Sequence, residues 1–185
     1  MFQDGVSVVT TTWKEKENVE KLVHAIQGEL CGYQHEIIII DDDSPDGTID
    51  VAKRYADVAV KKRREGQTKG LLYGMKLAKY PLIVTIDADL ENDPAYISEL
   101  LERIFNFDLV VASRMVIPRF SERFASKTLG KLFGVKDSFS NFRVYRKDIV
   151  SKFALRGGET FGAEFLVIAK RNRFRIGEIM YAPPS

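Results

Sequence analysis

The stretch "VTIDADLENDP" (residues 84–94) joins an apolar, β-favouring run to a cluster of acids. The apolar part belongs to "LIVTID" (82–87), which has the length and composition of a buried strand. Asp87 and Asp89 stand two residues apart, and Glu91 follows two places later. Side chains two residues apart in an extended chain point the same way, so we expect both aspartates on one side of the strand's end.

Short apolar runs alternate with helical patterns along the rest of the chain. Three more buried strands are predicted at "VSVVT" (6–10), "EIIIID" (36–41) and "LVVAS" (109–113). Helices are predicted between the strands, at 19–30 and at about 48–56, 69–79 and 94–105. This alternation predicts right-handed βαβ units and therefore an α/β fold with a mainly parallel sheet. In such sheets, ligands bind beyond the carboxyl ends of the strands.

Composition and charge limit the classes of protein. With 185 residues and 45% hydrophobic content, the chain can bury the core of one domain. The formal net charge of +2 does not indicate nucleic-acid binding. The single Cys31 excludes an internal disulfide and fits a reducing, cytosolic compartment. No stretch approaches the ~18 apolar residues of a membrane span, so we expect a soluble or membrane-surface protein.

The acids at the strand ends form the candidate site. Trp13 and Glu15 follow the first predicted strand, and Asp42 follows the second. Because carboxyl ends of parallel strands meet at one edge, these side chains should converge with the acids of "DADLE" (87–91). Crowded carboxylates repel one another unless a cation joins them, and hard oxygen ligands suit Mg²⁺ or Mn²⁺. The alternative is that these acids only solubilise loops or cap helices.

Six segments, in order and with similar spacing, resemble family 2 glycosyltransferases, and most closely their dolichol-phosphate mannosyltransferase branch. They are "TTTWKEKEN", "EIIIIDDDSPDGT", "IDADLENDP", "ASRM", "DSFSNFRVYRKDIV" and "FGAEFLVIAKRNRFRIGEI". The resemblance covers nearly the whole chain. It implies one GT-A domain over residues 1–185, with a nucleotide-sugar-binding half at 1–113 and an acceptor-binding half at 114–185.

The resemblance implies roles for individual residues. The nucleotide sugar would contact Thr11, Trp13, Glu15, Ile40, Asp42, Asp87, Ala88 and Asp89. The metal, Mg²⁺ or Mn²⁺, would lie on Asp87, Asp89 and Glu91 and neutralise charge on the leaving nucleotide. Asp89 would act in catalysis through this metal. Arg114 would lie near the acceptor phosphate, and Asp137 and Glu164 are the candidate bases, needed if the acceptor is a sugar hydroxyl.

The chain departs from the family pattern in several places. Thr11, Trp13 and Lys14 stand where proline, tyrosine and asparagine are common, and Asn141 stands where glycine is common. The Arg-x-Gly-x-Ser-Lys loop that commonly closes over the diphosphate would follow Ser185. A catalytically impaired GT-A chain that binds a nucleotide sugar or a partner protein is therefore an alternative.

Basic residues recur at every fourth position after Pro118. They are Arg119, Arg123, Lys127 and Lys131, which we call the basic stripe. At 100° per residue they fall within an arc of about 120° on a helix, flanked by bulky apolar residues. This pattern suits an anionic lipid surface or a polyprenyl phosphate, and equally an ordinary solvated helix face. Arg143 in "FRVYRK" would contact the acceptor phosphate, or else that segment is an edge strand with exposed basic residues.

Together these features predict the transfer of a hexose, with inversion of configuration, to a polyprenyl or dolichyl phosphate. Mannose is the first candidate for this hexose. The donor would be GDP-mannose, or UDP-glucose as the second choice. A phosphate acceptor is already ionised at neutral pH, so positioning and charge screening matter more than a base. The reaction would take place at the cytoplasmic face of a membrane, and a membrane-spanning partner protein is compatible with it. A response-regulator receiver domain is the alternative outside the transferases, although it would not have a whole βα unit before Asp41.

Overall fold

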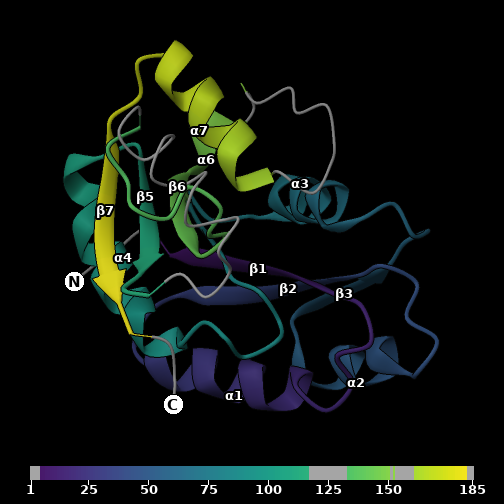
Figure 1. The fold of residues 1–185 in the computed structure, drawn as a ribbon. Helices are drawn as coiled ribbons and strands as arrows, with labels where there is room; N and C mark the ends of the chain where they lie inside the picture. Colours follow the sequence, from purple (N-terminus) through teal and green to yellow (C-terminus); the bar gives the residue numbers. More distant parts are fainter. Residues whose placement is uncertain (1–4, 117–132, 151, 153–160, 183–185) are drawn as a thin grey trace.

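A seven-stranded sheet organises the computed structural model, which describes residues 5–116, 133–150, 152 and 161–182 (Figure 1). Its order is β3-β2-β1-β4-β6-β5-β7. The strands are β1 (Val6–Thr12), β2 (His35–Asp41), β3 (Val58–Lys61), β4 (Leu82–Thr85), β5 (Leu109–Arg114), β6 (Arg143–Arg146) and β7 (Ile176–Tyr181). Strands β3, β2, β1 and β4 pair in parallel, and so do β5 and β7, which confirms the α/β fold with a mainly parallel sheet.

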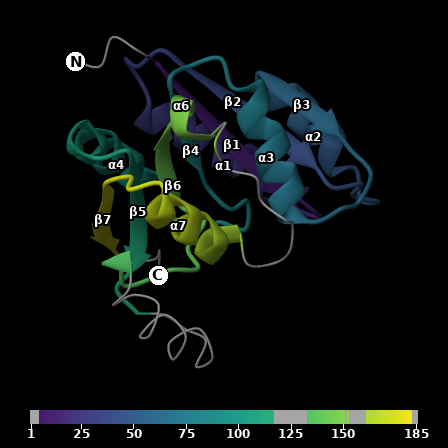
Figure 2. The same cartoon turned by 90° about the horizontal axis from the view of Figure 1, so that it is seen from above.

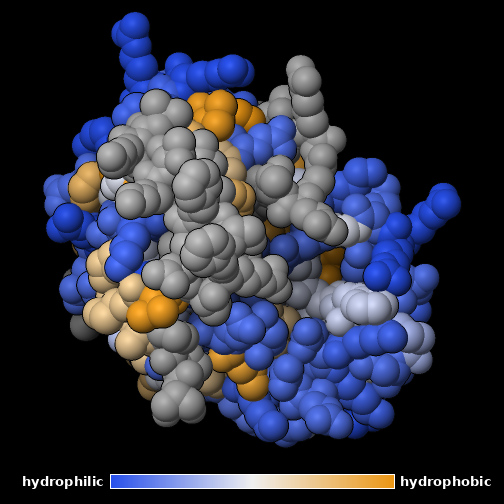
Figure 3. Space-filling model, in the orientation of Figure 1, coloured by the Kyte–Doolittle hydropathy of each residue, from blue (hydrophilic) through white to orange (hydrophobic). Residues whose placement is uncertain are grey.

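Helices cover both faces of this sheet (Figures 1 and 2). One face packs against α1 (Val19–Glu29), α2 (Thr48–Tyr55) and α4 (Ile97–Arg103), which lies between the 3₁₀ turns η1 (Pro94–Tyr96) and η2 (Ile104–Asn106). The other face packs against α3 (Gln67–Leu77), α6 (Lys147–Val150) and α7 (Phe161–Arg171). No helix in the described part of the chain is both long and apolar enough to span a membrane. The outer surface around α1 and α2 is largely hydrophilic (Figure 3).

The continuous isoleucine run of β2 is explained by burial on both faces. Ile37 and Ile39 belong to the core under α1, whereas Ile38 and Ile40 belong to the core under α3. All four side chains are fully buried. A strand covered on both faces needs apolar residues at every position, whereas a strand with one wet face alternates.

Strand β6 corrects the interpretation of "FRVYRK" as an edge strand. It lies inside the sheet and pairs antiparallel with both β4 and β5, so that Val144 is opposite Val84 on one side and Val110 on the other. Val144 and Tyr145 are fully buried. The described edges of the sheet are instead β3 and β7, two strands that the apolar runs did not predict.

Two glycines let α3 approach β1 closely. A Cβ atom on Gly70 would lie 2.6 Å from Cγ2 of Thr11, and one on Gly74 would lie 2.4 Å from Cγ1 of Val9. Both contacts are shorter than van der Waals distances permit, so a larger side chain would push the helix away. This close packing fixes the first turn of α3, which begins at Gln67, beside the end of β1.

Candidate active site

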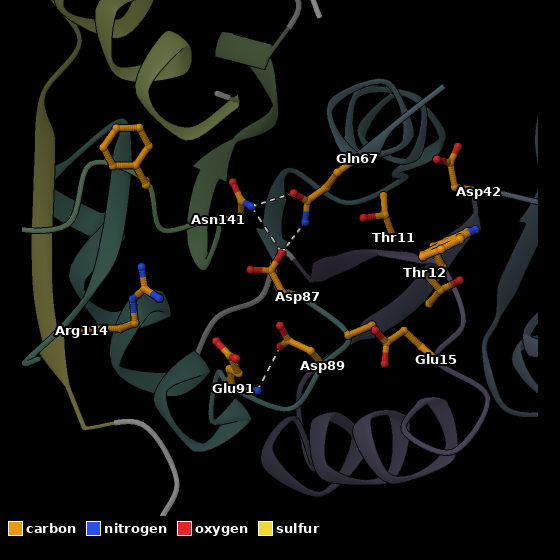
Figure 4. Close-up of a pocket in the computed structure, with 13 residues that line it drawn as sticks. Thr11, Thr12, Glu15, Asp42, Gln67, Asp87, Asp89, Glu91, Arg114 and Asn141 are labelled. Carbon is orange, nitrogen blue, oxygen red and sulfur yellow. Dashed lines mark hydrogen bonds between the residues drawn. The ribbon is translucent and has the colours of Figure 1, made fainter. Parts of the chain in front are cut away.

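A pocket of about 560 Å³ opens at the carboxyl edge of β1, β2 and β4 (Figure 4). Its volume is typical of small-molecule sites. With the exception of Ile40, every residue predicted to contact the nucleotide sugar lines it, and so do Glu91 and Arg114. Thr12, Gln67, Phe139 and Asn141 complete the lining without having been predicted. Ile40 is instead a core residue of β2.

Sharp turns bring the polar residues over the edge of the sheet. Soon after β1, β2 and β4 come residues with positive φ: Lys14 at 63°, Asp43 at 64° and Leu90 at 64°. Residues other than glycine rarely adopt a positive φ, and each residue held in this backbone conformation costs on the order of 1 kcal/mol or more. Such strain persists where the surrounding structure determines it, and here it folds the segments that carry Glu15, Asp42 and Asp89 over the pocket.

Asp87 lies half-buried at the centre of the pocket and is held by amide side chains. Its Oδ1 accepts hydrogen bonds from Nε2 of Gln67 at 2.6 Å and from Nδ2 of Asn141 at 3.3 Å. Its Oδ2 accepts a longer one from Nδ2 of Asn92 at 3.4 Å. Burial, and then the negative charge of Asp89, raise the pKa of Asp87 to about 6 against the opposing effect of the amides. The carboxylate therefore sits where additional positive charge would stabilise it.

Asp89 is exposed toward the same pocket. Its Oδ1 accepts a hydrogen bond from the backbone N–H of Glu91 at 3.0 Å, which fixes the turn between them. The described residues contain no group of three acidic, histidine or cysteine side chains arranged to hold a metal, so the expected set of Asp87, Asp89 and Glu91 is not assembled. The donor chemistry still fits a hard cation, because Mg²⁺ commonly uses one or two carboxylates and completes its shell with water and phosphate oxygens.

An aromatic side chain and a tethered loop form one end of the pocket. Trp13 is 40% exposed, with the guanidinium carbon of Arg64 3.9 Å from its ring centroid. Asp42 accepts hydrogen bonds from Nζ of Lys62 and from the backbone N–H groups of Glu65 and Gly66. Burial raises the pKa of Asp42, but these donors together hold it below its usual value. Arg64 was not among the predicted site residues, although it belongs to the conspicuous basic run "KKRR" (61–64).

Arg143 is not brought to the pocket, contrary to expectation. Its guanidinium is fully buried and donates to the backbone carbonyls of Ser140 at 2.6 Å, Gly162 at 2.9 Å and Ser138 at 3.0 Å. Ser138 and Ser140 belong to the segment that leads into β6, and Gly162 lies in the first turn of α7. This arrangement makes Arg143 a structural residue and removes it from the candidates for binding an acceptor phosphate.

Asp137 positions Arg114 at the opposite end of the pocket from Asp42 (Figure 4). The Oδ2 of Asp137 accepts a hydrogen bond from Nε of Arg114 at 2.7 Å, and its Oδ1 accepts from the backbone N–H groups of Phe139 and Ser140. Asp137 is fully buried, so its carboxylate orients the arginine and is not placed to act as a base. Glu164 lies in the first turn of α7 and is not among the residues that line the pocket. Arg123 and Lys127 fall outside the described residues.

A buried pair connects Asp87 to the end of β7. The hydroxyl of Tyr181 donates to Oδ1 of Asn92 at 2.5 Å, and Nδ2 of Asn92 in turn donates to Asp87. Tyr181 is fully buried and packs edge-on against Phe142. Tyr181 and Asn92 were not among the predicted site residues, because no local pattern relates residues 89 positions apart.

Comparison with curated proteins identifies relatives whose names each include a polyprenol-type phosphate. The chain is 33% identical over 165 residues to "Dolichol-phosphate mannosyltransferase" of Pyrococcus furiosus, covering 78% of this chain and 47% of the relative. It is 30% identical over 173 residues to "Dodecaprenyl-phosphate galacturonate synthase" of Rhizobium johnstonii, covering 82% and 51%. The chain thus spans about half the length of these relatives.

Solved structures with the same fold include glucosyl-3-phosphoglycerate synthase from Mycobacterium tuberculosis. One such structure, in complex with phosphoglyceric acid, matches with a TM-score of 0.83 at 20% identity, over 99% of this chain and 72% of that one. Another structure of this protein, in complex with Mn²⁺, UDP and glucosyl-3-phosphoglycerate, matches with a TM-score of 0.82 at 19% identity. This match also covers 99% of this chain and 72% of that one. At this identity the likeness establishes the fold alone, which is GT-A.

A family model assigns the chain and excludes the receiver-domain alternative. The model described as "Glycosyl transferase family 2" matches residues 7–157, which is most of the chain. The identity to the Pyrococcus furiosus protein leads to the same assignment. The acidic residues that follow β1, β2 and β4 therefore line the pocket of a GT-A domain, and the chain belongs to glycosyl transferase family 2.

Proposed function

We propose that this chain is the catalytic domain of an inverting glycosyltransferase that moves a hexose from a nucleotide diphosphate sugar to a polyprenyl phosphate. One observation carries the proposal: Asp87 and Asp89 share a single pocket with Trp13, and in Figure 4 Asp42 lies at one end of this pocket and Arg114 at the other. The names of the curated relatives support a polyprenyl-phosphate acceptor. GDP-mannose is the first candidate donor and UDP-glucose the second.

The donor lies across the pocket from Trp13 towards Arg114. The base stacks near the half-exposed indole of Trp13, and the carboxylate of Asp42 accepts hydrogen bonds from the nucleoside. Thr11 and Glu15 line the same end and offer further polar contacts. The diphosphate then lies over Asp89, which leaves the sugar beside Asp87.

Asp89 is the carboxylate best placed to hold Mg²⁺ or Mn²⁺, because it is exposed and none of the amides that bind Asp87 contacts it. When bound, the cation supplies Lewis-acid stabilisation of the charge that develops on the leaving diphosphate. The Mn²⁺ and UDP of the Mycobacterium tuberculosis structure support this choice of cation. Asp87 adds negative charge close by, which strengthens the attraction for the cation.

Arg114 receives the acceptor phosphate. Asp137 holds its Nε, which orients the guanidinium at the pocket wall. An ionised phosphate oxygen needs no base, so attack on the anomeric carbon from the face opposite the leaving group requires mainly positioning and charge screening. The new bond forms as the bond to the diphosphate breaks, and the configuration inverts.

A transfer assay tests this function. We expect the protein, with Mn²⁺ and detergent-solubilised polyprenyl phosphate, to move radiolabel from GDP-mannose or UDP-glucose into an organic-soluble product. EDTA should abolish that transfer because the leaving diphosphate loses its counter-charge. Nucleotide binding that persists with Mn²⁺ while no lipid product forms from any donor would favour the catalytically impaired alternative.

We further propose that the basic stripe attaches the domain to the cytoplasmic face of a membrane. Changing Arg123 and Lys127 together to glutamine should weaken binding to anionic vesicles by at least about tenfold, since each charge contributes about 1 kcal/mol. Co-sedimentation across a salt series measures this effect. The matched control is the same double change at Lys53 and Arg54, two exposed basic residues in the last turn of α2. Equal vesicle binding by both double variants would contradict a role for the stripe.

A further inference from the structure

Two amide side chains form a bridge directly beside the central carboxylate. Gln67 is the first residue of α3, and Asn141 lies in the segment just before β6. Nδ2 of Asn141 donates to Oε1 of Gln67 at 3.1 Å, and both side chains also donate to the same Oδ1 of Asp87. Figure 4 shows the two amides reaching each other beside this carboxylate. We call this pair the amide bridge.

The amide bridge keeps hydrogen-bonding capacity that it does not use internally. Both hydrogens of Nδ2 of Asn141 are committed, one to Asp87 and one to Gln67. Its Oδ1 is buried and has no partner among the described residues. Nε2 of Gln67 carries two hydrogens, and its hydrogen bond to Asp87 occupies one of them. The oxygen of Asn141 points away from Asp87 (Figure 4) and is too buried to meet a ligand, so the amide bridge offers the pocket one donor, the second hydrogen on Nε2 of Gln67, which the oxygen of a sugar hydroxyl can accept.

The charges around the amide bridge select against an acidic sugar. The described lining contains acidic side chains at Glu15, Asp42, Asp87, Asp89 and Glu91. Its single basic side chain is Arg114, which Asp137 orients and which the proposed function assigns to the acceptor phosphate. A sugar carboxylate placed here would meet like charges without a free cationic partner in the described lining, whereas neutral hydroxyls would not.

We infer that Gln67 is a specificity-determining residue that donates to a hydroxyl group of the transferred sugar, that Asn141 positions Gln67, and that this sugar is a neutral hexose and not a uronic acid. The inference rests on the proposed function and deepens it by naming the class of sugar. One relative is named as a galacturonate synthase, so the distinction separates this chain from a member of its own family. The contacts of Asn141 with Gln67 and Asp87 then serve to aim the Gln67 amide at the sugar.

Calorimetric titration with Mn²⁺ tests the inference. The probes are UDP, UDP-glucose and UDP-galacturonate, with GDP and GDP-mannose as a second series. We expect the wild-type chain to bind at least one neutral-sugar nucleotide more tightly than the bare nucleotide, and the uronate at least about tenfold more weakly than UDP-glucose. The variants Gln67→Leu and Asn141→Gly should each weaken the preferred nucleotide sugar about fivefold more than the bare nucleotide.

Gln27→Leu is the matched control, because Gln27 is an exposed glutamine within α1 that does not line the pocket. Equal weakening of bare nucleotide and nucleotide sugar in both bridge variants would overturn the inference, since the amide bridge would then only support Asp87. Equal affinity for UDP-glucose and UDP-galacturonate would overturn the assigned sugar class. Failure of the wild-type chain to bind any of the nucleotides would instead overturn the proposed function, and the inference with it.

Discussion

Asp89→Ala is expected to weaken Mn²⁺-dependent binding of GDP or UDP by at least about 100-fold, because losing the exposed metal-binding carboxylate removes several kcal/mol of charge stabilisation. The fold should stay intact, since the side chain is exposed and, within the described part of the chain, accepts only a local backbone hydrogen bond from Glu91. Removing a charge that repels Asp87 should not lower the free energy of unfolding. Titration calorimetry with and without Mn²⁺ measures the affinity, and circular dichroism the melting temperature.

Asp93→Ala provides the control for this experiment. The carboxylate of Asp93 accepts a hydrogen bond from the backbone N–H of Ala95 at 2.9 Å, so it caps η1 and does not line the pocket. Its loss should cost about 1 kcal/mol of stability and leave nucleotide affinity unchanged. Unchanged nucleotide binding in Asp89→Ala, or an equal loss in Asp93→Ala, would contradict the assignment of the metal to Asp89.

Arg143→Met is expected to destabilise the protein by about 3 kcal/mol or more. The substitution keeps an unbranched apolar stem but leaves the carbonyls of Ser138, Ser140 and Gly162 without their buried donor. Each buried polar group left unpaired costs about 1–3 kcal/mol. For a chain of this size, 3 kcal/mol corresponds to a fall of about 6–12 °C in melting temperature, which differential scanning calorimetry can measure.

Arg175→Met is the contrasting variant. Arg175 pairs with an acid, Asp108, at 3.1 Å, and its side chain is 61% exposed. Surface pairs of this kind contribute about 0–1 kcal/mol, so the melting temperature should change little. An unchanged melting temperature in Arg143→Met together with lost transfer to polyprenyl phosphate would restore Arg143 as an acceptor-binding residue and contradict its structural role.

Local patterns in the sequence were sufficient to predict much of the sheet and the principal acids of the pocket. The runs at 6–10, 36–41 and 109–113 lie within β1, β2 and β5, as predicted. The run at 82–87 includes β4, whose last strand residue is Thr85. These predictions succeeded because a parallel strand buried on both faces has a continuous apolar signature, and because carboxyl ends of parallel strands share an edge. The edge position of Asp42, Asp87 and Asp89 follows from chain order alone.

The sequence by itself thus determined the alternation of strands and helices and the edge where the acids gather, because both depend on short-range periodicity. Only the tertiary structure decided the position of β6 within the sheet and the inward direction of Arg143, since an arginine in an alternating strand has the same local pattern at an edge and in the interior. The same holds for the contact between Gln67 and Asn141, which are 74 residues apart. Such contacts arise when α3 and the segment before β6 pack on one sheet, and no local pattern encodes that packing.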